Sequence, residues 1–221
     1  MSEISNQHKT VLANLAAASK RAGREAADLV AVSKIQPDAR IAEMLKTGQR
    51  IFGENRVQEA QTRWGETFAD HRGDVELRLI GPLQTNKAAD AVALFDVIET
   101  VDREKLLKAL VKAVGADGTM PRLYVQVNTG EEEQKSGVRP ADLPAFLKLM
   151  RETYELEPEG LMCIPPAGEA ASPHFWMLSN LAKNNGVAKL SMGMSGDYEI
   201  AAEMGATSVR VGSALFGARK T

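Results

Sequence analysis

Eight short apolar runs alternate with helical segments along this chain, and this alternation limits the possible folds more than any other feature. The runs are rich in the β-branched and aliphatic residues typical of strands, and they lie at 29–33, 50–53, 76–81, 94–100, 122–128, 160–164, 189–194 and 207–213. The segments between them carry apolar residues at helical spacing, and they cover 38–48, 55–70, 82–93, 102–115, 140–153, 172–186 and 196–205. Because parallel strands need such crossover segments, the sequence predicts an α/β fold with a parallel sheet.

Eight repeats favour a closed (β/α)8 TIM barrel over an open doubly wound sheet, which usually has five or six strands. The runs at 76–81 and 94–100 are the least typical, because the first carries polar residues and the second could extend a helix. Val11, Leu12, Leu15 and Ala18 predict an additional amphipathic helix before the first strand. We therefore expect a single domain over residues 1–221.

Composition excludes several classes of protein. Apolar residues make up 44% and charged residues 25% of the chain, with no block of like charge, as in a globular protein. The net charge of -2 argues against nucleic acid as a partner, because such proteins gather Lys and Arg on one face. The start of the chain lacks the pattern of a secretory signal, and no apolar run is long enough to span a membrane, so we expect a cytoplasmic protein. The single cysteine, Cys163, suits a reducing compartment.

Barrels of this class place their sites at the carboxyl ends of the strands, and Lys34 ends the apolar run LVAVSK. An amine at that position loses hydration, which favours the neutral form that attacks an aldehyde to form a Schiff base. The alternative is a lysine whose stem packs on the barrel rim while its amine reaches water.

Two glycine-rich segments follow the last two strands, SMGMSGD at 191–197 and RVGSALFG at 210–217. Such turns present backbone N–H groups, and a phosphate site after strands seven and eight recurs in TIM barrels. A phosphate there and an aldehyde at Lys34 are the two ends of pyridoxal 5'-phosphate (PLP). Alternatively, the glycines only form tight turns, or the barrel binds another phosphorylated metabolite without covalent chemistry.

Arg210 directly precedes the second glycine turn, so its guanidinium could face the pyridine nitrogen of such a cofactor. Arginine keeps its proton, and an arginine partner leaves the ring nitrogen unprotonated and the cofactor a poorer electron sink. The alternative is an ion pair within the barrel, for example with Glu54.

Seven blocks occur in order between residues 29 and 217: AVSKIQP, FGENRVQEA, IGPLQTNK, VNTGEEEQKSG, GLMCIPP, LSMGMSGD and VRVGSALFG. Together they resemble the pyridoxal phosphate homeostasis protein family, which is similar to the N-terminal barrel of alanine racemase and of eukaryotic-type ornithine decarboxylase. The resemblance implies a cytoplasmic barrel that carries PLP on Lys34 and acts in vitamin B6 and amino-acid homeostasis.

The resemblance also implies roles for individual residues. Ser195, Gly212 and Ser213 would hold the phosphate, Arg210 would face the ring nitrogen, and Asn55 would line the pocket. One departure concerns the third strand, where the family often has Trp-His-Phe and this chain has Leu77, Arg78 and Leu79. The acidic segment Glu131 to Glu133 and Lys135 resemble a variable mouth loop, for which a solvated turn is the simpler interpretation.

Two functions remain open at this point: a PLP carrier with little or no turnover, and a PLP-dependent amino-acid racemase or decarboxylase. Racemisation needs an acid and a base on opposite faces of the substrate, and the chain lacks the second domain that supplies one of them in alanine racemase. We therefore expect a monomeric PLP-binding protein without catalytic residues, with PLP-dependent apo-enzymes as possible partners. If the cofactor is instead attached to Lys87 or Lys135, the assignment of Lys34 as the attachment point is wrong.

The remaining polar and sulfur-containing residues receive no role in catalysis or metal binding. His8, His71 and His174 are far apart in the sequence, have no metal-binding spacing, and are expected at the surface or in loops. Cys163 is expected to behave as a small buried residue. Met192 and Met194 are expected to pack in the core, although Met194 stays among the candidate pocket residues because it lies in the first glycine turn.

Overall fold

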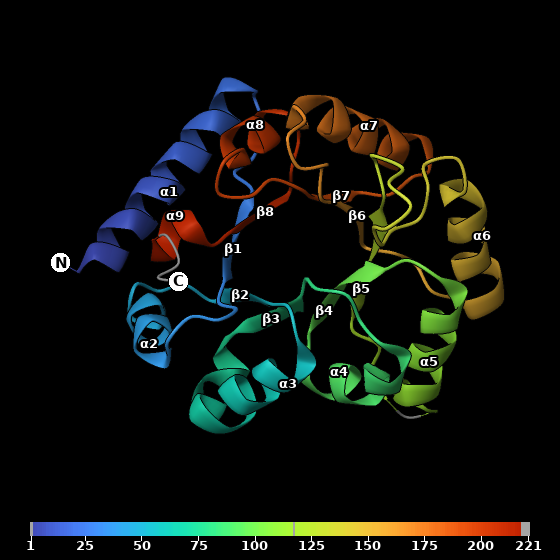
Figure 1. Cartoon of the computed structure of the whole chain (residues 1–221), viewed down its shortest axis with the longest axis horizontal. Coiled ribbons are helices and arrows are strands. Elements are labelled where there is room, and N and C mark those ends of the chain that lie inside the picture. The colour runs from blue at the N-terminus through green and yellow to red at the C-terminus, as the bar shows by residue number, and fades with distance from the viewer. Residues whose placement is uncertain (1, 117, 218–221) are drawn as a thin grey trace.

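The sheet closes on itself because the last strand, β8 (Ser208–Val211), pairs in parallel with the first, β1 (Asp28–Val32). Val30 lies opposite Arg210 in this pairing. A computed structural model of the chain describes residues 2–116 and 118–217, and within them the strand order runs from β1 to β8 around a closed barrel (Figure 1). The expected (β/α)8 barrel is confirmed.

The strand bounds agree with the eight expected runs to within a few residues. The other strands are β2 (Ile51–Glu54), β3 (Glu76–Leu79), β4 (Val97–Val101), β5 (Arg122–Val127), β6 (Gly160–Cys163) and β7 (Lys189–Ser191). The α-helices are α1 (Glu3–Arg21), α2 (Asp38–Lys46), α3 (Val57–Ala60), α4 (Ala88–Leu94), α5 (Glu104–Val114), α6 (Leu143–Tyr154), α7 (Ala171–Asn184), α8 (Tyr198–Glu203) and α9 (Ser213–Phe216). None of the helices in the described ranges is long and apolar enough to cross a bilayer.

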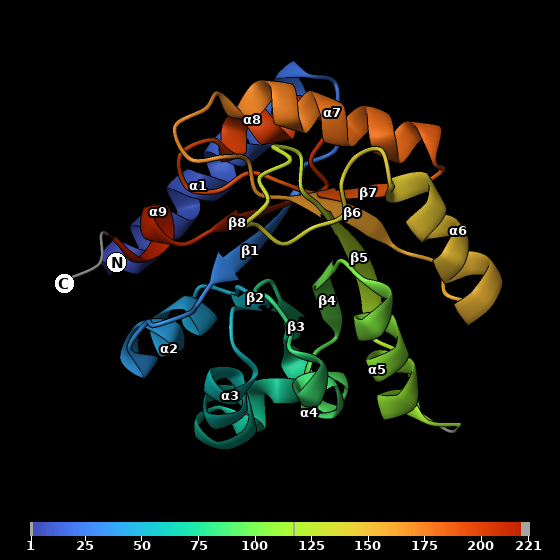
Figure 2. The same cartoon turned by 45° about the vertical axis from the view of Figure 1, so that its right-hand side comes forward.

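The helices surround the strands, and the expected N-terminal helix α1 lies outside this ring against α8 and α9 (Figures 1 and 2). Its apolar face is buried through Ile4, Val11 and Leu15, as its helical spacing requires. Asn14 donates to the hydroxyl oxygen of Tyr198 on α8 over 3.1 Å. Helix α1 therefore covers the seam where β8 meets β1.

Side chains of each strand alternate between two environments. Residues such as Leu29, Phe52 and Leu79 face outward into the core between the strands and the helices. A small apolar cluster of Val97, Tyr124 and Met162 is separate from that outer core. Alternation places these three side chains inside the barrel, as expected for a packed TIM-barrel interior.

The segment 55–70, expected as one helix, is divided into several pieces. Helix α3 continues into a π-helix, η1 (Gln61–Thr67), and a 3-10 helix, η2 (Ala69–Asp74), follows. Another 3-10 helix, η3 (Thr85–Lys87), precedes α4. The π-helix buries Arg63 and Trp64 behind the strand end that leads to the candidate site, and π-helical turns are frequent beside functional sites.

Candidate functional site

A pocket of about 300 Å³ opens at the carboxyl ends of the strands. All of the residues expected from the sequence line it, namely Lys34, Asn55, Met194, Ser195, Arg210, Gly212 and Ser213. Two further lining residues, Gly196 and Gly217, belong to the two predicted glycine-rich segments. The lining residues that were not expected are Val32, Gln36, Ile80 and Ile164. Residues from both ends of the sequence thus meet at one pocket, which has a polar side and an apolar side.

The apolar side of the pocket was missed in the sequence. Val32 is the last residue of β1 and Lys34 lies two residues beyond it, and both side chains line the pocket. Ile80 and Ile164 follow β3 and β6 in the same way. These side chains offer flat apolar surface to a ring-shaped ligand, and strand periodicity was the signal that would have identified them.

Lys34 follows the buried end of β1, and its half-buried side chain reaches the pocket. The neighbouring residue, Ser33, points the other way and donates from Oγ to Oε1 of Glu54 over 2.7 Å. Among the described residues that line the pocket, Lys34 is the only lysine. The fold therefore singles out this amine from the other lysines of the chain.

The turn after Lys34 is strained and held from outside the barrel. Ile35 has a positive φ of 61°, which is rare for a β-branched residue. Its backbone N–H donates to Oε1 of Glu59 over 2.6 Å, and the carbonyl of Gln36 accepts from Nη2 of Arg63 over 2.9 Å. Strained backbone of this kind persists where surrounding contacts fix it, often at binding sites.

Glu54 is fully buried behind this turn. Its Oε1 accepts from Nη1 of Arg63 over 2.7 Å and from Nε1 of Trp64 over 3.2 Å, while Oε2 has no hydrogen-bond partner. Burial raises the pKa of the Glu54 carboxyl, and the Arg63 guanidinium opposes that effect. The suggested ion pair between Glu54 and Arg210 is wrong, because Glu54 shares the outward face of β2 with Phe52.

The two glycine-rich turns meet at the pocket through Ser195. Its Oγ accepts from the backbone N–H groups of Gly212, over 3.1 Å, and Ala214, over 3.3 Å. The hydroxyls of Ser195 and Ser213 are neutral donors suited to an anion, and the two amides would be available to an anion that takes the place of the Ser195 oxygen. The turn itself requires a glycine at Gly193, where φ is 93° and a Cβ would lie 2.4 Å from that of Ala201.

Arg210 is 4% exposed, and its guanidinium is fixed at two points inside the barrel. Nη1 donates to Oγ of Ser191 over 2.6 Å, and Nη2 donates to the carbonyl of Cys163 over 2.7 Å. The carboxylate facing it belongs to Glu99, whose Oε2 lies 3.8 Å from Nη1. An arginine has five N–H groups, so donors remain for a ligand in the pocket that Arg210 lines.

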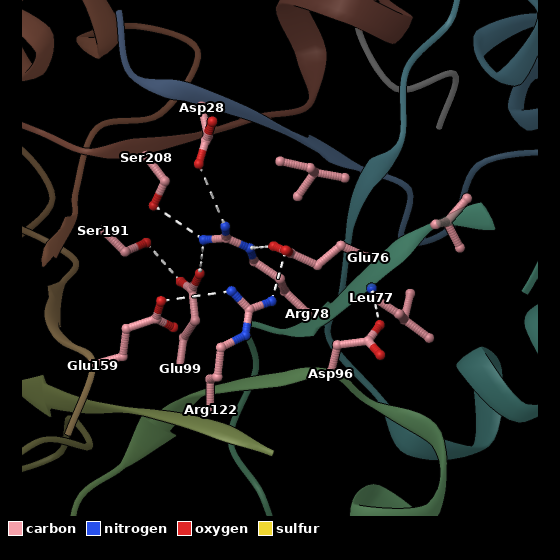
Figure 3. A network of polar contacts seen from close by, with 12 residues as sticks. Asp28, Glu76, Leu77, Arg78, Asp96, Glu99, Arg122, Glu159, Ser191 and Ser208 are labelled. Carbon is pink, nitrogen blue, oxygen red and sulfur yellow. Dashed lines mark hydrogen bonds and ion pairs between the residues drawn. The ribbon is translucent and has the colours of Figure 1, made fainter. Parts of the chain in front are cut away.

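Arg78, at the position where the family often has histidine, also lies inside the barrel. It donates from Nη1 to Oε1 of Glu99 over 3.1 Å, as Figure 3 shows. No partner for Arg78 was predicted, because β3 and β4 are connected by a helix and their register is unknown until the sheet is seen.

Asn55 enters the pocket at a point where two chain segments almost touch. A Cβ on Gly81 would lie 2.3 Å from the backbone oxygen of Asn55, so only glycine allows this approach. The segments after β2 and β3 are thereby held together at the mouth.

The alternative amines lie elsewhere at the mouth. Lys87 pairs with Asp90 over 3.3 Å, and Lys135 pairs with Glu132 over 2.5 Å. Each lines a cavity next to the pocket of Lys34. Within the acidic segment, Glu131 and Glu133 are exposed, in keeping with a solvated turn.

The histidine prediction is wrong for two of the three residues. His8 and His174 are buried, and only His71 is exposed. His8 Nε2 lies 3.0 Å from Oε1 of Gln49, and His174 lies between Thr129 and Glu169. Both ring nitrogens of His174 and Nε2 of His8 have hydrogen-bond partners within the fold. The described residues contain no group of three His, Cys, Asp or Glu side chains arranged for a metal ion.

The two methionines behave differently. Met192 is buried in the outer core, as expected. Met194 is 38% exposed and lines the pocket, so the expectation that it packs in the core is wrong. The period of two along β7 explains the burial of Met192, and the turn at Gly193 redirects Met194.

Comparison with known proteins agrees with this architecture. Residues 8–220 match the family model of the alanine racemase N-terminal domain. Solved structures of alanine racemase from Clostridium difficile (14% identity, TM-score 0.70) and of a lysine/ornithine decarboxylase from Vibrio vulnificus (12%, 0.69) share the fold. This chain covers 57% and 61% of those two chains. Fold and pocket thus define a barrel of the alanine racemase N-terminal class.

More similar relatives extend over nearly the whole chain. The pyridoxal phosphate homeostasis protein of Pseudomonas aeruginosa is 40% identical over 99% of this chain and 97% of its own length, and that of Escherichia coli is 34% identical over 99% and 98%. PipY of Synechococcus elongatus, solved with PLP bound, has a TM-score of 0.82 at 36% identity, covering 97% of this chain and 100% of that chain. The chain belongs to the pyridoxal phosphate homeostasis protein family.

Proposed function

We propose that this chain is a PLP-binding protein of vitamin B6 and amino-acid homeostasis that carries the cofactor as a Schiff base on Lys34. The observation that carries the proposal is that Lys34 and the donors of Ser195 and Ser213 line one pocket. The relatives named for PLP homeostasis and the PLP-bound structure of PipY support it. In this proposal the domain spans residues 1–221.

The residues present fit the three functional groups of the cofactor, namely its phosphate, its ring nitrogen and its aldehyde. Neutral hydroxyl and amide donors suit the phosphate, and the arginine at the pocket wall suits an acceptor nitrogen. When bound, PLP supplies an aldehyde that condenses reversibly with a primary amine and releases water. Lys34 serves as that amine, and Val32, Ile80 and Ile164 exclude water from the ring faces they contact.

The composition of the pocket lining supports a carrier with little or no turnover. A racemase or decarboxylase moves protons to and from a substrate carbon, and racemisation needs groups on both faces. Among the described lining residues, Lys34 and Arg210 are the only ionisable side chains, because the others are apolar, amide or hydroxyl groups, and arginine keeps its proton. Arg210 also lacks the acidity needed to protonate the ring nitrogen.

The experiment combines visible spectroscopy with chemical trapping. Purified protein mixed with PLP is expected to turn yellow, to lose the colour with borohydride, and to yield a reduced cofactor on the peptide that contains Lys34. Lys34→Ala should abolish trapping, while the matched control Lys87→Ala should keep it. A trapped peptide containing Lys87 or Lys135 would refute the assignment, and a substantial racemase or decarboxylase rate that depends on Lys34 would refute the carrier role.

We infer further that the protein works as a cytoplasmic monomer that delivers PLP to apo-enzymes. One chain supplies the whole pocket lining, and its single buried thiol, Cys163, suits a reducing compartment. Size-exclusion chromatography with light scattering tests the monomer. Loss of the yellow colour as a purified PLP-dependent apo-enzyme gains activity tests delivery.

A further inference from the structure

The interior of the barrel contains charged residues where TIM barrels usually have branched apolar ones. Arg78, Glu99 and Arg210 are 3%, 0% and 4% exposed. Arg78 also pairs with Glu76, Nε to Oε1 over 2.5 Å, and Glu99 is the carboxylate that faces both arginines. Buried ion pairs are weak evidence for stability, since desolvation offsets much of their attraction. The geometry of the cluster indicates a different role.

Glu99 uses its two carboxylate oxygens for two different partners (Figure 3). Oε1 accepts from Nη1 of Arg78 over 3.1 Å, and Oε2 accepts from Oγ of Ser191 over 2.6 Å. The register of β4 against β5 shifts between Ile98 and Val101, and such irregularities redirect side chains. Glu99 lies within that shift and reaches β3 and β7 from there.

Ser191 connects this carboxylate to the pocket. Its hydroxyl has one proton, which it donates to Glu99, and its oxygen accepts from Nη1 of Arg210 over 2.6 Å. The direction of both hydrogen bonds is therefore fixed, because the carboxylate can only accept and the guanidinium can only donate. The carbonyl of Cys163 fixes Nη2 of the same guanidinium, so Arg210 is held in one plane.

We infer that Glu99 and Ser191 are positioning residues that aim Arg210 at the acceptor nitrogen of the bound cofactor, with Arg78 as the counter-ion that balances Glu99. The inference rests on the proposed function, because it assumes that PLP occupies the pocket. It adds a specificity determinant: the pocket selects a ring with an acceptor nitrogen over the same ring with a C–H group. Selectivity of this kind needs a donor with a fixed direction.

The test compares the affinity of the protein for PLP and for 1-deaza-PLP, in which C–H replaces the ring nitrogen. The wild-type protein is expected to prefer PLP by about tenfold or more, the range of a hydrogen bond from a charged donor. In Ser191→Ala the preference should fall to about threefold or less, because Arg210 loses its anchor. The affinity of Ser191→Ala for 1-deaza-PLP should stay close to that of the wild type. A variant that failed to fold would lose affinity for both ligands.

A matched control is Ser208→Ala. Ser208 is also a buried serine of the barrel, and its Oγ accepts from Nη1 of Arg78 over 3.2 Å, whereas no hydrogen bond links it to Arg210. This variant should keep the preference for PLP. Glu99→Gln is the second test variant, and it should lower the preference like Ser191→Ala while keeping the shape of the side chain.

The outcomes separate this inference from the proposed function. If wild-type protein shows no trapping of PLP on Lys34, the proposed function fails. If trapping occurs but the preference for PLP over 1-deaza-PLP survives in folded Ser191→Ala or Glu99→Gln protein, the positioning role is overturned. Equal loss of preference in Ser208→Ala would also overturn it, because removal of any buried hydroxyl from the barrel would then have the same effect.

Discussion

Arg63 and Glu54 form a buried ion pair, with Nη1 and Oε1 2.7 Å apart, directly behind the strand end that leads to Lys34. Arg63 also holds the carbonyl of Gln36 in the turn that follows this lysine. The pair therefore connects the π-helix to both sides of the proposed attachment point. Through the contact with Gln36, the pair constrains the geometry of the turn.

Replacing Arg63 by methionine should lower the free energy of unfolding by about 3 kcal/mol or more, because removing one partner leaves Glu54 buried without compensation. Urea denaturation at neutral pH measures this change. Lys108→Met is the control, since Lys108 pairs with Glu104 at the surface, where solvent screens the pair and little change in stability is expected. Similar losses in the two variants would contradict the role assigned to the buried pair.

The thiol of Cys163 should be inert in the folded protein. Burial raises its pKa to about 12, although Arg210 opposes this effect, so almost no reactive thiolate exists near pH 8. A chromogenic disulfide reagent is expected to react only after denaturant is added. Rapid stoichiometric reaction of folded protein would show that Cys163 is accessible, contrary to the packing described.

Glu76 should contribute to stability in a pH-dependent way. Burial alone would raise its pKa, but Arg122 and Arg78 outweigh burial and hold the pKa below the usual 4.5. Stabilisation is therefore present above pH 4.5 and is lost as the pH falls through the lower value of the folded state. Glu76→Gln should be less stable than wild type at pH 7, and the difference should shrink in acid. A constant difference across this range would contradict the ion pairs at the barrel base.

Gly81→Ala should disturb the mouth through the backbone of Asn55, a residue that lines the pocket. The new Cβ would lie 2.3 Å from the backbone oxygen of Asn55, and such overpacking against backbone costs about 1–3 kcal/mol. Denaturation should show a lower free energy of unfolding, and titration with PLP should show a lower affinity. Gly73→Ala, where a Cβ would meet nothing within 4 Å, serves as control and should change neither.

Much of the fold follows from residue patterns within short windows. The eight apolar runs, the parallel connections and helix α1 were predicted, because strand and helix periodicities are local properties. The segment 55–70 was not predicted correctly. Its apolar spacing is helical throughout, and the π-helix depends on Arg63 reaching Glu54, a contact that propensities do not encode.

The candidate site was likewise predicted only in those features that depend on short stretches of sequence. Lys34 and the glycine turns could be located, because they directly follow strands that the sequence defines. The partner of Arg210 could not be identified, since Glu54 and Glu99 differ only in which side of the sheet they face. Alternation along β2 would have excluded Glu54, because it shares a face with the apolar Phe52, but the choice of Glu99 needs the register of the closed barrel.

The central claim is that one molecule of PLP joins Lys34 to the donors of the last two strands. A crystal structure of the protein grown with PLP tests it most directly. We expect continuous density from Nζ of Lys34 to the carbon of the aldehyde, with the phosphate between Ser195, Gly212 and Ser213. PLP bonded to another lysine, or a phosphate bound away from these three residues, would contradict the claim.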